Sequence, residues 1–343
     1  MKKKIDICTI VDNACVPDDD PEFYRKPGDD PTVDSYTEYR VVRTLRRLGH
    51  AVRVVGVGDD VPALLKSLSN PSPRIVFNLT EQFRGKRRLD QNVAALLEMI
   101  QIPFTGAGST GLVICRNKGV CKNILSSRKI HVPNHTIYTP GRTVRAPGYL
   151  HFPLVVKPLY EDGSDGISNA SLVRTADELR ERVAVVHSNW KQPAIAEEFI
   201  EGRELYAGVL GNRRLTVLPL RELQFGRADE GGPVMATYRV KWDIDYQVKW
   251  DIDFVNARVD ESLNRVISRI ARKVFHLLQM NDYGRIDIRL TPENRVYVLE
   301  ANPNPGLAPE DEVGLGARKA GISYTELIDR ILRTALRRYG ISN

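Results

Sequence analysis

The sequence has no long apolar run, since none reaches the roughly 18 residues that a membrane-spanning helix requires. Its start, Met1 to Lys4, is basic, but Asp6 and Asp12 follow too soon for the apolar core of a secretion signal. The 4 cysteines show no C-x-x-C spacing of the kind that favours a metal site. We therefore expect no membrane partner, reduced thiols and a cytoplasmic location.

Two familiar nucleotide-binding motifs are missing or misplaced. No G-x-x-x-x-G-K-[ST] segment occurs, which excludes a Walker-type phosphate loop. Gly106 to Gly111 spells G-x-G-x-x-G, but it follows three predicted strands, and residues 126–131 lack the acid that a dinucleotide fold uses for ribose. We expect no nicotinamide cofactor, and any nucleotide must be bound in another way.

Positive charge is in modest excess, with 50 Lys and Arg against 43 Asp and Glu and a net charge of +7. The basic residues form short, scattered pairs with acids among them, and no aromatic residues interleave as a nucleic-acid stacking platform requires. A cationic cleft for a polyphosphate explains the excess equally well. We expect no nucleic-acid partner, and a salt-dependent affinity for DNA or RNA would revive that alternative.

The first third of the chain alternates strands and helices. Strands are predicted over 4–11, 51–57 and 74–79, and helices over 35–49, 61–68 and 90–100. This alternation predicts an α/β fold with a doubly wound parallel sheet. The segment from Asp12 to Asp34 is rich in Asp and Pro and long for a plain connection, which predicts that it is mobile or functional.

The rest of the chain reads as α+β. Helices are predicted over 118–127, 176–186, 261–279 and 325–339, strands over 154–157, 167–173, 194–200, 204–210, 214–218, 284–290 and 296–301, and a charged loop over 224–259. We divide the chain into an N-terminal lobe of residues 1–115, a central lobe of 116–191 and a C-terminal lobe of 192–343.

One short repeat occurs, in which residues 238–245 and 246–253 share the pattern Tyr-x-Val-Lys-Trp-Asp-Ile-Asp. Two copies are too few for a solenoid, so a local duplication in a surface loop is expected. Either Lys241 or Lys249 could face a ligand.

Acids and an amide gather on one predicted hairpin near the C-terminus. Asp287 can lie across from Glu300, and Asn302, two residues on, shares a face with Glu300. Two carboxylates and an amide form a hard-oxygen site suited to Mg²⁺ on phosphates. Arg285 shares the face of Asp287 and could reach a transferring phosphoryl group. The alternative is a solvated hairpin face with an ion pair.

The segments around this hairpin could complete a phosphate site. Gly306 follows two prolines, and its N–H could approach an oxyanion, although a plain turn is the alternative. Lys157 ends a strand, and Gly163 to Gly166 gives a loop whose N–H groups could cover phosphates, or a simple hairpin turn. The acids from Glu197 to Glu204 could hold adenine and ribose or lie in a solvated turn.

Taken together, these motifs resemble the ATP-grasp superfamily, and within it the D-alanine–D-alanine ligase-like branch. The match runs from about Arg74 to Leu332. It rests on Ile102-Pro-Phe-Thr-Gly-Ala-Gly108, Lys118, Phe152-Pro-Leu-Val-Val-Lys157-Pro158, Glu197-Glu-Phe-Ile-Glu-Gly-Arg-Glu204, Lys241-Trp242, Gly284-Arg-Ile-Asp287, Glu300-Ala-Asn-Pro-Asn-Pro-Gly306-Leu307 and Ala320-Gly-Ile-Ser-Tyr324.

The resemblance implies a two-lobed ATP-grasp fold after the N-terminal domain, with ATP between the lobes. It assigns Lys118, Lys157, Lys241 and Ser164 to the phosphates, Glu197, Phe199 and Ile200 to adenine, Glu204 to ribose, Asp287, Glu300 and Asn302 to two Mg²⁺ ions (with Mn²⁺ as an alternative), and Arg285 and the Gly306 N–H to the developing charge.

The activity that the resemblance implies is amide or peptide bond formation between an amino-acid or peptide-like carboxylate and an amine. The carboxylate would be activated as an acyl phosphate before the amine attacks it, in a closed site that excludes water. The resemblance also implies small-molecule substrates and a homodimer.

Departures from the family pattern lie in the substrate loops. The family's Gly-rich loop after the first strand corresponds to Asp12 to Asp34, and its His-Gly-x-x-Gly-Glu-Asp-Gly segment to Thr80 to Lys86. One serine of its double-serine loop is Gly163, and a loop tyrosine is Trp242. The residue expected at the carboxylate of the second substrate falls near Asp311 and Glu312, which would repel it.

The predicted function is a carboxylate–amine ligase whose substrates differ from those of D-alanine–D-alanine ligase. Two alternatives to it stay open. The first is D-alanine–D-alanine ligase itself, which the altered loops disfavour. The second is a nucleotide-binding sensor without turnover, which the intact set of phosphate and metal residues disfavours.

Overall fold

The computed structural model describes residues 4–17 and 35–341, so most of the segment from Asp12 to Asp34 lies outside the described residues. The elements of the N-terminal lobe are β1 (Asp6–Asp12), α1 (Ser35–Arg47), β2 (Ala51–Val57), α2 (Val61–Ser69), β3 (Ile75–Asn78), α3 (Asp90–Met99) and α4 (Ser109–Arg116). They follow the predicted order, with α4 as an addition.

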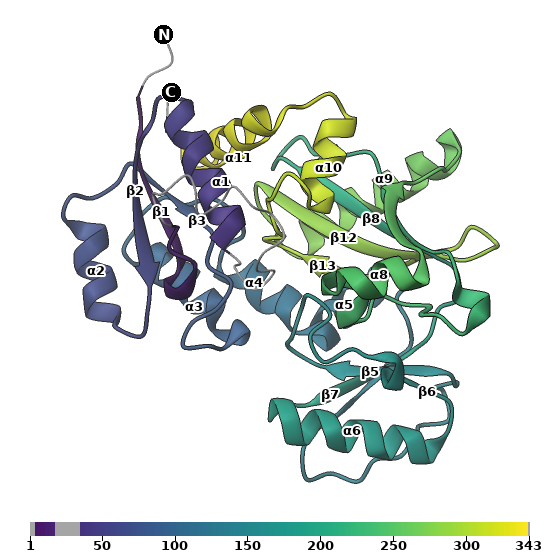
Figure 1. The fold of residues 1–343 in the computed structure, drawn as a ribbon. Coiled ribbons are helices and arrows are strands. Elements are labelled where there is room, and N and C mark those ends of the chain that lie inside the picture. The colour runs from purple at the N-terminus through teal and green to yellow at the C-terminus, as the bar shows by residue number, and fades with distance from the viewer. Residues whose placement is uncertain (1–3, 18–34, 342–343) are drawn as a thin grey trace.

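The N-terminal strands form a parallel sheet in the order β2-β1-β3, covered by helices on both faces (Figure 1). Alternate residues of β1 point to opposite faces. Ile7 packs in a core with α1 and α11 (Tyr324–Arg338), whereas Cys8 and Ile10 pack in a core with α2 and α3. The predicted doubly wound parallel sheet is therefore confirmed.

The central sheet is antiparallel, in the order β4-β7-β5-β6. Its strands are β4 (His135–Tyr138), β5 (Leu154–Pro158), β6 (Leu172–Val173) and β7 (Ala194–Glu198), and α6 (Ala176–Trp190) covers one face (Figure 1). The predicted strand over 167–173 is largely wrong, because Ser168 and Ser171 form a capping box that starts a 3-10 turn. Strand β7 pairs with β4 and β5 although it follows the predicted boundary at residue 191, and that boundary stays a prediction.

The large sheet has the order β11-β10-β8-β12-β13, with β9 beside β8. The bounds are β8 (Arg203–Leu210), β9 (Thr216–Val217), β10 (Arg221–Phe225), β11 (Ile252–Asn256), β12 (Tyr283–Leu290) and β13 (Val296–Asn302). Helices α5 (Lys118–Ser127) and α9 (Glu261–Leu277) pack on one face in a shared apolar core. Since α5 packs here, the predicted central lobe begins with a helix that belongs to the core of the C-terminal lobe.

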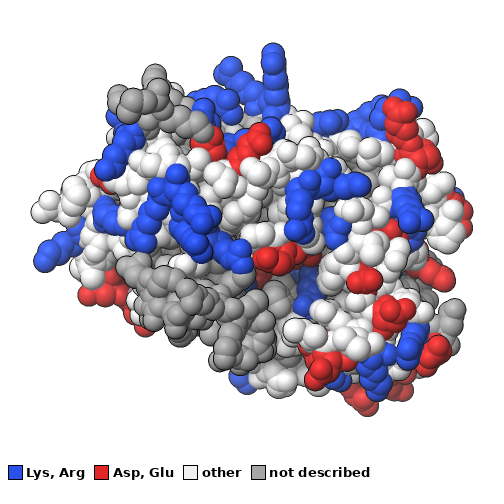
Figure 2. All heavy atoms as spheres, turned by 45° about the horizontal axis from the view of Figure 1, so that its top comes forward, with Lys and Arg blue, Asp and Glu red and all other residues white. Residues whose placement is uncertain are grey.

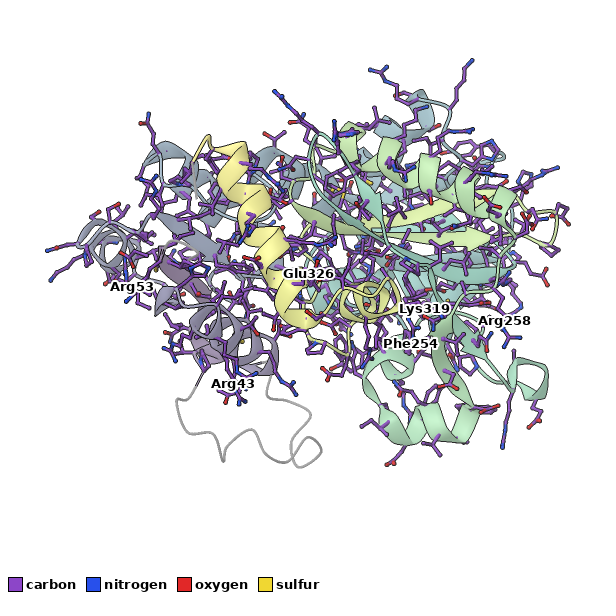
Figure 3. All side chains as sticks on the ribbon, turned by 90° about the horizontal axis from the view of Figure 1, so that it is seen from above. Arg43, Arg53, Phe254, Arg258, Lys319 and Glu326 are labelled. Atoms are coloured by element: carbon purple, nitrogen blue, oxygen red, sulfur yellow. The ribbon has the colours of Figure 1, made fainter. Side chains whose placement is uncertain are left out.

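Helix α11 joins the N-terminal sheet to the large sheet. Seen from above, α11, which carries Glu326, lies across the boundary between the two sheets (Figure 3). Its buried residues share one core with Ile7 of β1 and Tyr283 of β12. The N-terminal lobe is therefore held against the C-terminal lobe by an apolar contact as well as by polar ones.

The predicted charged loop over 224–259 is wrong, since this segment contains α7 (Tyr238–Trp242), α8 (Ile244–Trp250) and β11. Both helices begin at a capping residue. The side chain of Thr237 accepts a hydrogen bond from Val240 N, and that of Asp243 accepts one from Tyr246 N. Capping by residues of the repeat and its flank, rather than apolar periodicity, starts these two short helices.

The G-x-G-x-x-G segment serves helix packing. It leads into α4, and Gly111 lies so close to the carbonyl oxygen of Gln279 that a Cβ would come within 2.6 Å of it. The last glycine of the motif therefore allows α4 to lie against the backbone at Gln279. Among the described residues, no helix combines the length and the apolar character needed to cross a membrane.

Candidate functional site

A cleft opens between the central sheet and the large sheet. Clefts between two lobes that are lined by a few convergent charged side chains are typical of small-molecule sites. Its lining residues come from both sheets, α5, α7 and the loop after β5. They are Lys118, Val155, Lys157, Pro158, Glu161, Asp162, Ser164, Asp165, Ile167, Glu197, Glu198, Phe199, Ile200, Glu204, Met235, Ala236, Lys241, Asp287, Arg289, Leu299 and Glu300.

At the back of the cleft two lysines bind one carboxylate. Lys122 Nζ lies 3.3 Å from Glu197 Oε1, and Lys157 Nζ lies 3.1 Å from Glu197 Oε2. Burial opposes the charge of Glu197, but the two lysines outweigh it and lower the pKa of this carboxyl. Burial lowers the pKa of Lys122, which also donates to the carbonyl of Leu299. Lys122 was not among the predicted site residues. The pattern that could have pointed to it is a lysine on the apolar face of α5.

Three lysines surround Glu300, namely Lys118, Lys157 and Lys241. Burial opposes ionisation of this carboxyl, yet the lysines hold the pKa of Glu300 below its usual value. Lys118 also donates to the carbonyl of Glu161 in the loop after β5. The predicted phosphate residues therefore line one cleft with the predicted metal ligands Asp287 and Glu300.

The predicted C-terminal hairpin forms, with Asp287 opposite Glu300 and Arg285 opposite Asn302. A β-bulge follows Asp287, as Leu299 has no register partner in β12. Arg285 Nε and Nη2 donate to the two oxygens of Asp287 at 2.7 and 3.0 Å, and Asn302 Nδ2 donates to Asp287 Oδ2 at 3.1 Å. These contacts confirm that the four side chains share one end of the hairpin.

The donor set suits Mg²⁺ that shares its shell with phosphates. No cluster of three or more His, Cys, Asp and Glu residues that could hold a metal ion occurs among the described residues. Asp287 and Glu300 supply carboxylate oxygens, and Asn302 turns its amide nitrogen to Asp287, which leaves its oxygen for another partner. Mg²⁺ commonly takes one or two carboxylates and completes its shell with phosphate and water oxygens.

Arg285 and Gly306 lie beside two acids at the start of α10 (Glu312–Lys319). Asp311 precedes this helix and Glu312 is its first residue. Arg285 Nη1 donates to Glu312 Oε2 at 2.7 Å. Asp311 accepts from Ala308 N at 2.7 Å, and its carboxylate lies where a side chain on Gly306 would have to be. Burial, with Glu312 nearby, raises the pKa of Asp311 to about 7. Neither Arg285 nor Gly306 lines the cleft, and nor does Asn302.

The predicted adenine and ribose residues line the same cleft. Glu204 binds Arg289 Nη2 at 2.8 Å and accepts from the Tyr206 hydroxyl at 2.9 Å. The guanidinium of Arg289 also lies 5.3 Å from the ring centre of Phe199. Arg289 was missed from the sequence, although it lies two residues beyond Asp287 on the same strand.

The loop after β5 is bound to α7 and the segment before it. Ser164 Oγ donates to the carbonyl of Ala236 at 2.7 Å, and Trp242 Nε1 donates to that of Gly163 at 2.9 Å. Lys241 lines the cleft, whereas Lys249 lies over the Trp250 ring, 5.0 Å from its centre. Of the two repeated lysines, Lys241 is therefore the one that faces the cleft.

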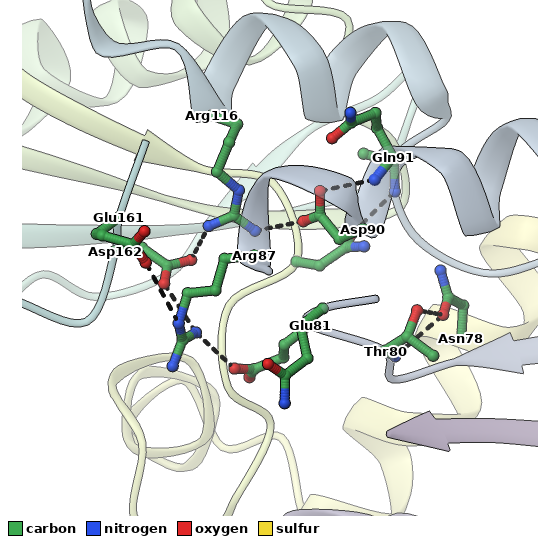
Figure 4. A network of polar contacts seen from close by, with 12 residues as sticks. Asn78, Thr80, Glu81, Arg87, Asp90, Gln91, Arg116, Glu161 and Asp162 are labelled. Atoms are coloured by element: carbon green, nitrogen blue, oxygen red, sulfur yellow. Dashed lines mark hydrogen bonds and ion pairs between the residues drawn. The ribbon is translucent and has the colours of Figure 1, made fainter. Parts of the chain in front are cut away.

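The other side of this loop meets charged residues of the N-terminal lobe (Figure 4). Arg87 Nη1 lies 2.8 Å from Asp162 Oδ1 and 2.9 Å from Glu81 Oε2. Arg116 bridges Asp162 and Asp90. These arginines were not among the predicted site residues, because their partners lie far away in sequence.

Basic residues do not form one continuous surface on the face shown in Figure 2. Lys and Arg side chains lie there in separate groups with Asp and Glu between them.

Comparison with known proteins shows that the chain is similar to D-alanine–D-alanine ligases. Residues 137–333 match the family model described as D-ala D-ala ligase C-terminus. A relative from Sinorhizobium fredii, described as uncharacterized protein y4sG, is 32% identical over 304 residues and covers 87% of each chain. The D-alanine–D-alanine ligase of Aquifex aeolicus is 27% identical over 292 residues, which cover 85% of this chain and 92% of that protein.

A solved structure shares the fold over nearly the whole chain. The D-alanine–D-alanine ligase from Bacillus anthracis, complexed with ATP, matches with a TM-score of 0.75 at 20% identity and covers 98% of this chain and 99% of that one.

Proposed function

Because the chain belongs to the D-alanine–D-alanine ligase family and is an ATP-grasp ligase that forms carbon–nitrogen bonds, we propose that it joins an amino-acid or peptide-like carboxylate to an amine. The observation that carries the proposal is the single cleft lined by Lys118, Lys157 and Lys241 together with the paired acids Asp287 and Glu300.

We place ATP in this cleft, since ATP use follows from the relatives that the chain resembles. Lys118, Lys157 and Lys241 would bind its phosphates with Ser164 above them. Phe199 and Ile200 would border adenine, with Glu197 at its amino group and Glu204 at the ribose. The ion pairs of Glu197 and Glu204 with Lys157 and Arg289 hold these carboxylates in place for such contacts.

Asp287, Glu300 and Asn302 would hold Mg²⁺, and we propose two ions. ATP and Mg²⁺ together supply the phosphoryl group that activates the carboxylate and the charge that stabilises its transfer. Mn²⁺ offers the same oxygen-ligand chemistry and is an alternative.

The residues at the end of the hairpin would act on the acid substrate. Arg285 is held in a fixed orientation by Asp287 and Glu312, so its guanidinium presents a positive charge without having to reorganise. The Gly306 N–H would donate to the oxyanion that forms when the amine attacks. Lys241, on α7, would neutralise charge from the side of the cleft that closes.

The identity of the amine is proposed from Asp311 and Glu312. These acids lie beside Arg285 and Gly306, where a second substrate's carboxylate would meet like charge. We propose an amine substrate that is cationic or lacks a free carboxylate. Replacing both acids with Ser should shift the preference toward amines with a carboxylate, and an unchanged preference would contradict this assignment.

Two other readings have direct tests. D-alanine–D-alanine ligase is the same chemistry with D-alanine as both substrates, and absence of dipeptide at high D-alanine would exclude it. A nucleotide sensor would bind ATP without turnover across all substrates. We further propose a homodimer, which sedimentation would test.

The experiment is a matrix of acids and amines, with D-alanine included, scored by ADP release and by product mass. The proposal expects Mg²⁺-dependent ADP release with a product of joined mass for at least one acid and amine pair. ATP binding with no joined product anywhere in the matrix would contradict it.

A further inference from the structure

The loop of residues 161–167 is held from two sides. On the side of the C-terminal lobe, the loop is bound to the segment 236–242 by three hydrogen bonds. Two are those of Ser164 and Gly163 described above, and in the third Tyr238 N donates to the Ile167 carbonyl at 2.9 Å. On the other side, Asp162 is bound by Arg87, which precedes α3, and by Arg116, the last residue of α4 (Figure 4). The loop therefore touches both neighbouring lobes while it lines the cleft.

The two arginines differ in burial and in partners. Arg116 is 12% exposed, and its other partner, Asp90, is 3% exposed, so this pair is part of the protein interior. Arg87 is 32% exposed, and one nitrogen, Nη1, contacts both Glu81 and Asp162. Arg87 is thus the accessible link between the segment 80–90 and the cleft loop.

The segment 80–90 begins at the carboxyl end of β3. There the backbone N–H groups of Glu81 and Gln82 donate to Asp12, the last residue of β1, at 3.4 Å each. Ligands of open parallel sheets bind outside the carboxyl ends of the strands. A substrate would therefore bind at this edge of the N-terminal sheet. Arg87 connects the edge to the loop that lines the cleft.

We propose that Arg87 is a positioning residue that, through Asp162, holds the loop 161–167 closed over the cleft while the N-terminal lobe is in place. The inference rests on the proposed function for its consequence in the reaction. A loop held closed keeps water from the activated acid, and a loosened loop lets water attack the acyl carbon, which releases free acid and inorganic phosphate.

The first test needs no substrate. Hydrogen exchange of the amides of Asp165 and Ile167, which donate within the loop to Asp162 O and Ser164 O, reports its opening. Arg87→Ala should speed their exchange about tenfold, as expected for a lost charge-assisted hydrogen bond. Arg87→Lys should restore part of the protection. Arg180→Ala, which removes the exposed pair with Asp177 on α6, is the matched control and should leave the exchange unchanged.

The second test uses the acid and amine pair found in the matrix. Arg87→Ala should release more ADP than product, with kcat for product reduced more than the KM for ATP is raised. A double-mutant cycle with Asp162→Asn should show that the two changes are not additive.

The outcomes separate the two proposals. If the protein joins no acid and amine pair, the proposed substrates are refuted. If Arg87→Ala nevertheless speeds the exchange of the loop amides, the link through Arg87 is supported. Wild-type exchange together with a wild-type ratio of ADP to product would overturn the role of Arg87 and leave the proposed function intact.

Discussion

The cleft proposed for ATP and the edge that faces the N-terminal lobe carry their charged residues on different kinds of structure. In the cleft, Lys157, Glu197, Asp287 and Glu300 lie on paired strands, whose register fixes their neighbours. At the edge, charged residues lie on loops and helix starts, where they bind one another, as Arg87 binds Asp162. Of the residues proposed for phosphate and metal, strands thus hold Lys157, Asp287 and Glu300. The acids proposed for substrate choice, Asp311 and Glu312, lie instead at the start of α10.

The largest loss of activity is expected when a carboxylate on one of the strands is neutralised. Glu300→Gln should reduce ADP release about 1000-fold, because it removes a proposed metal ligand and the counter-charge of three lysines. Steady-state ADP release measures this, with the exposed Glu201→Gln as control. Turnover close to that of the wild type would refute the metal assignment.

The buried pairs of the cleft should matter for stability as well. Lys122→Met removes one of the two ammonium groups on Glu197 and should lower the free energy of unfolding by about 3 kcal/mol, since a buried carboxylate loses a partner. Denaturant unfolding measures it, and Lys66→Met on the exposed face of α2 should change little. A Lys122 variant as stable as the wild type would show that Lys157 alone satisfies Glu197.

At the edge, Asp311 should make stability depend on pH. The pKa of Asp311 is raised to about 7, so the folded protein holds this proton more tightly than the unfolded chain, whose aspartates titrate near pH 4. This group therefore favours folding at low pH and loses that contribution as the pH rises from about 4 to 7.

Asp311→Asn keeps an acceptor for Ala308 N but has no charge to bury. Relative to the wild type, this variant should gain about 2 kcal/mol at pH 8, about half of what the pKa difference alone implies, because Asp311 is only partly buried and solvent screens its charge. It should gain nothing at pH 4. Unfolding measured across this range tests the prediction, and parallel curves for the two proteins would contradict it.

The smallest effect is expected at the contact between the cleft loop and α7. Trp242→Phe removes the hydrogen bond to Gly163 and keeps an aromatic ring, so it should weaken ATP binding by about 1 kcal/mol. Titration with ATP and Mg²⁺ measures this. A change as large as that of Glu300→Gln would mean that loops and strands contribute alike.

The sequence predicted the strands of the cleft well, because alternation places Asp287, Glu300 and Asn302 on one face wherever the hairpin forms. It also predicted the doubly wound N-terminal sheet from the alternation of apolar runs. Four short helices were not predicted, because they begin at capping residues or at glycines and are too short to show a clear apolar period. They are α4, α7, α8 and α10.

The arginine contacts at the edge could not be predicted. Arg87 and Asp162 lie in different lobes, 75 residues apart in the sequence, and a charge pair leaves no periodic pattern. Lys122 escaped for another reason, as an isolated lysine in a helix usually faces solvent. The assignments of individual side chains to ATP, metal and substrate stay predictions.

The most direct test of the central claim is the ratio of ADP to joined product, measured on one sample with the acid and amine pair from the matrix. We predict one ADP for each new amide bond, and no ADP release above background when Mg²⁺, the acid or the amine is left out. ADP release that persists without the amine, or that yields no product of joined mass, would contradict the assignment of this chain as a carboxylate–amine ligase.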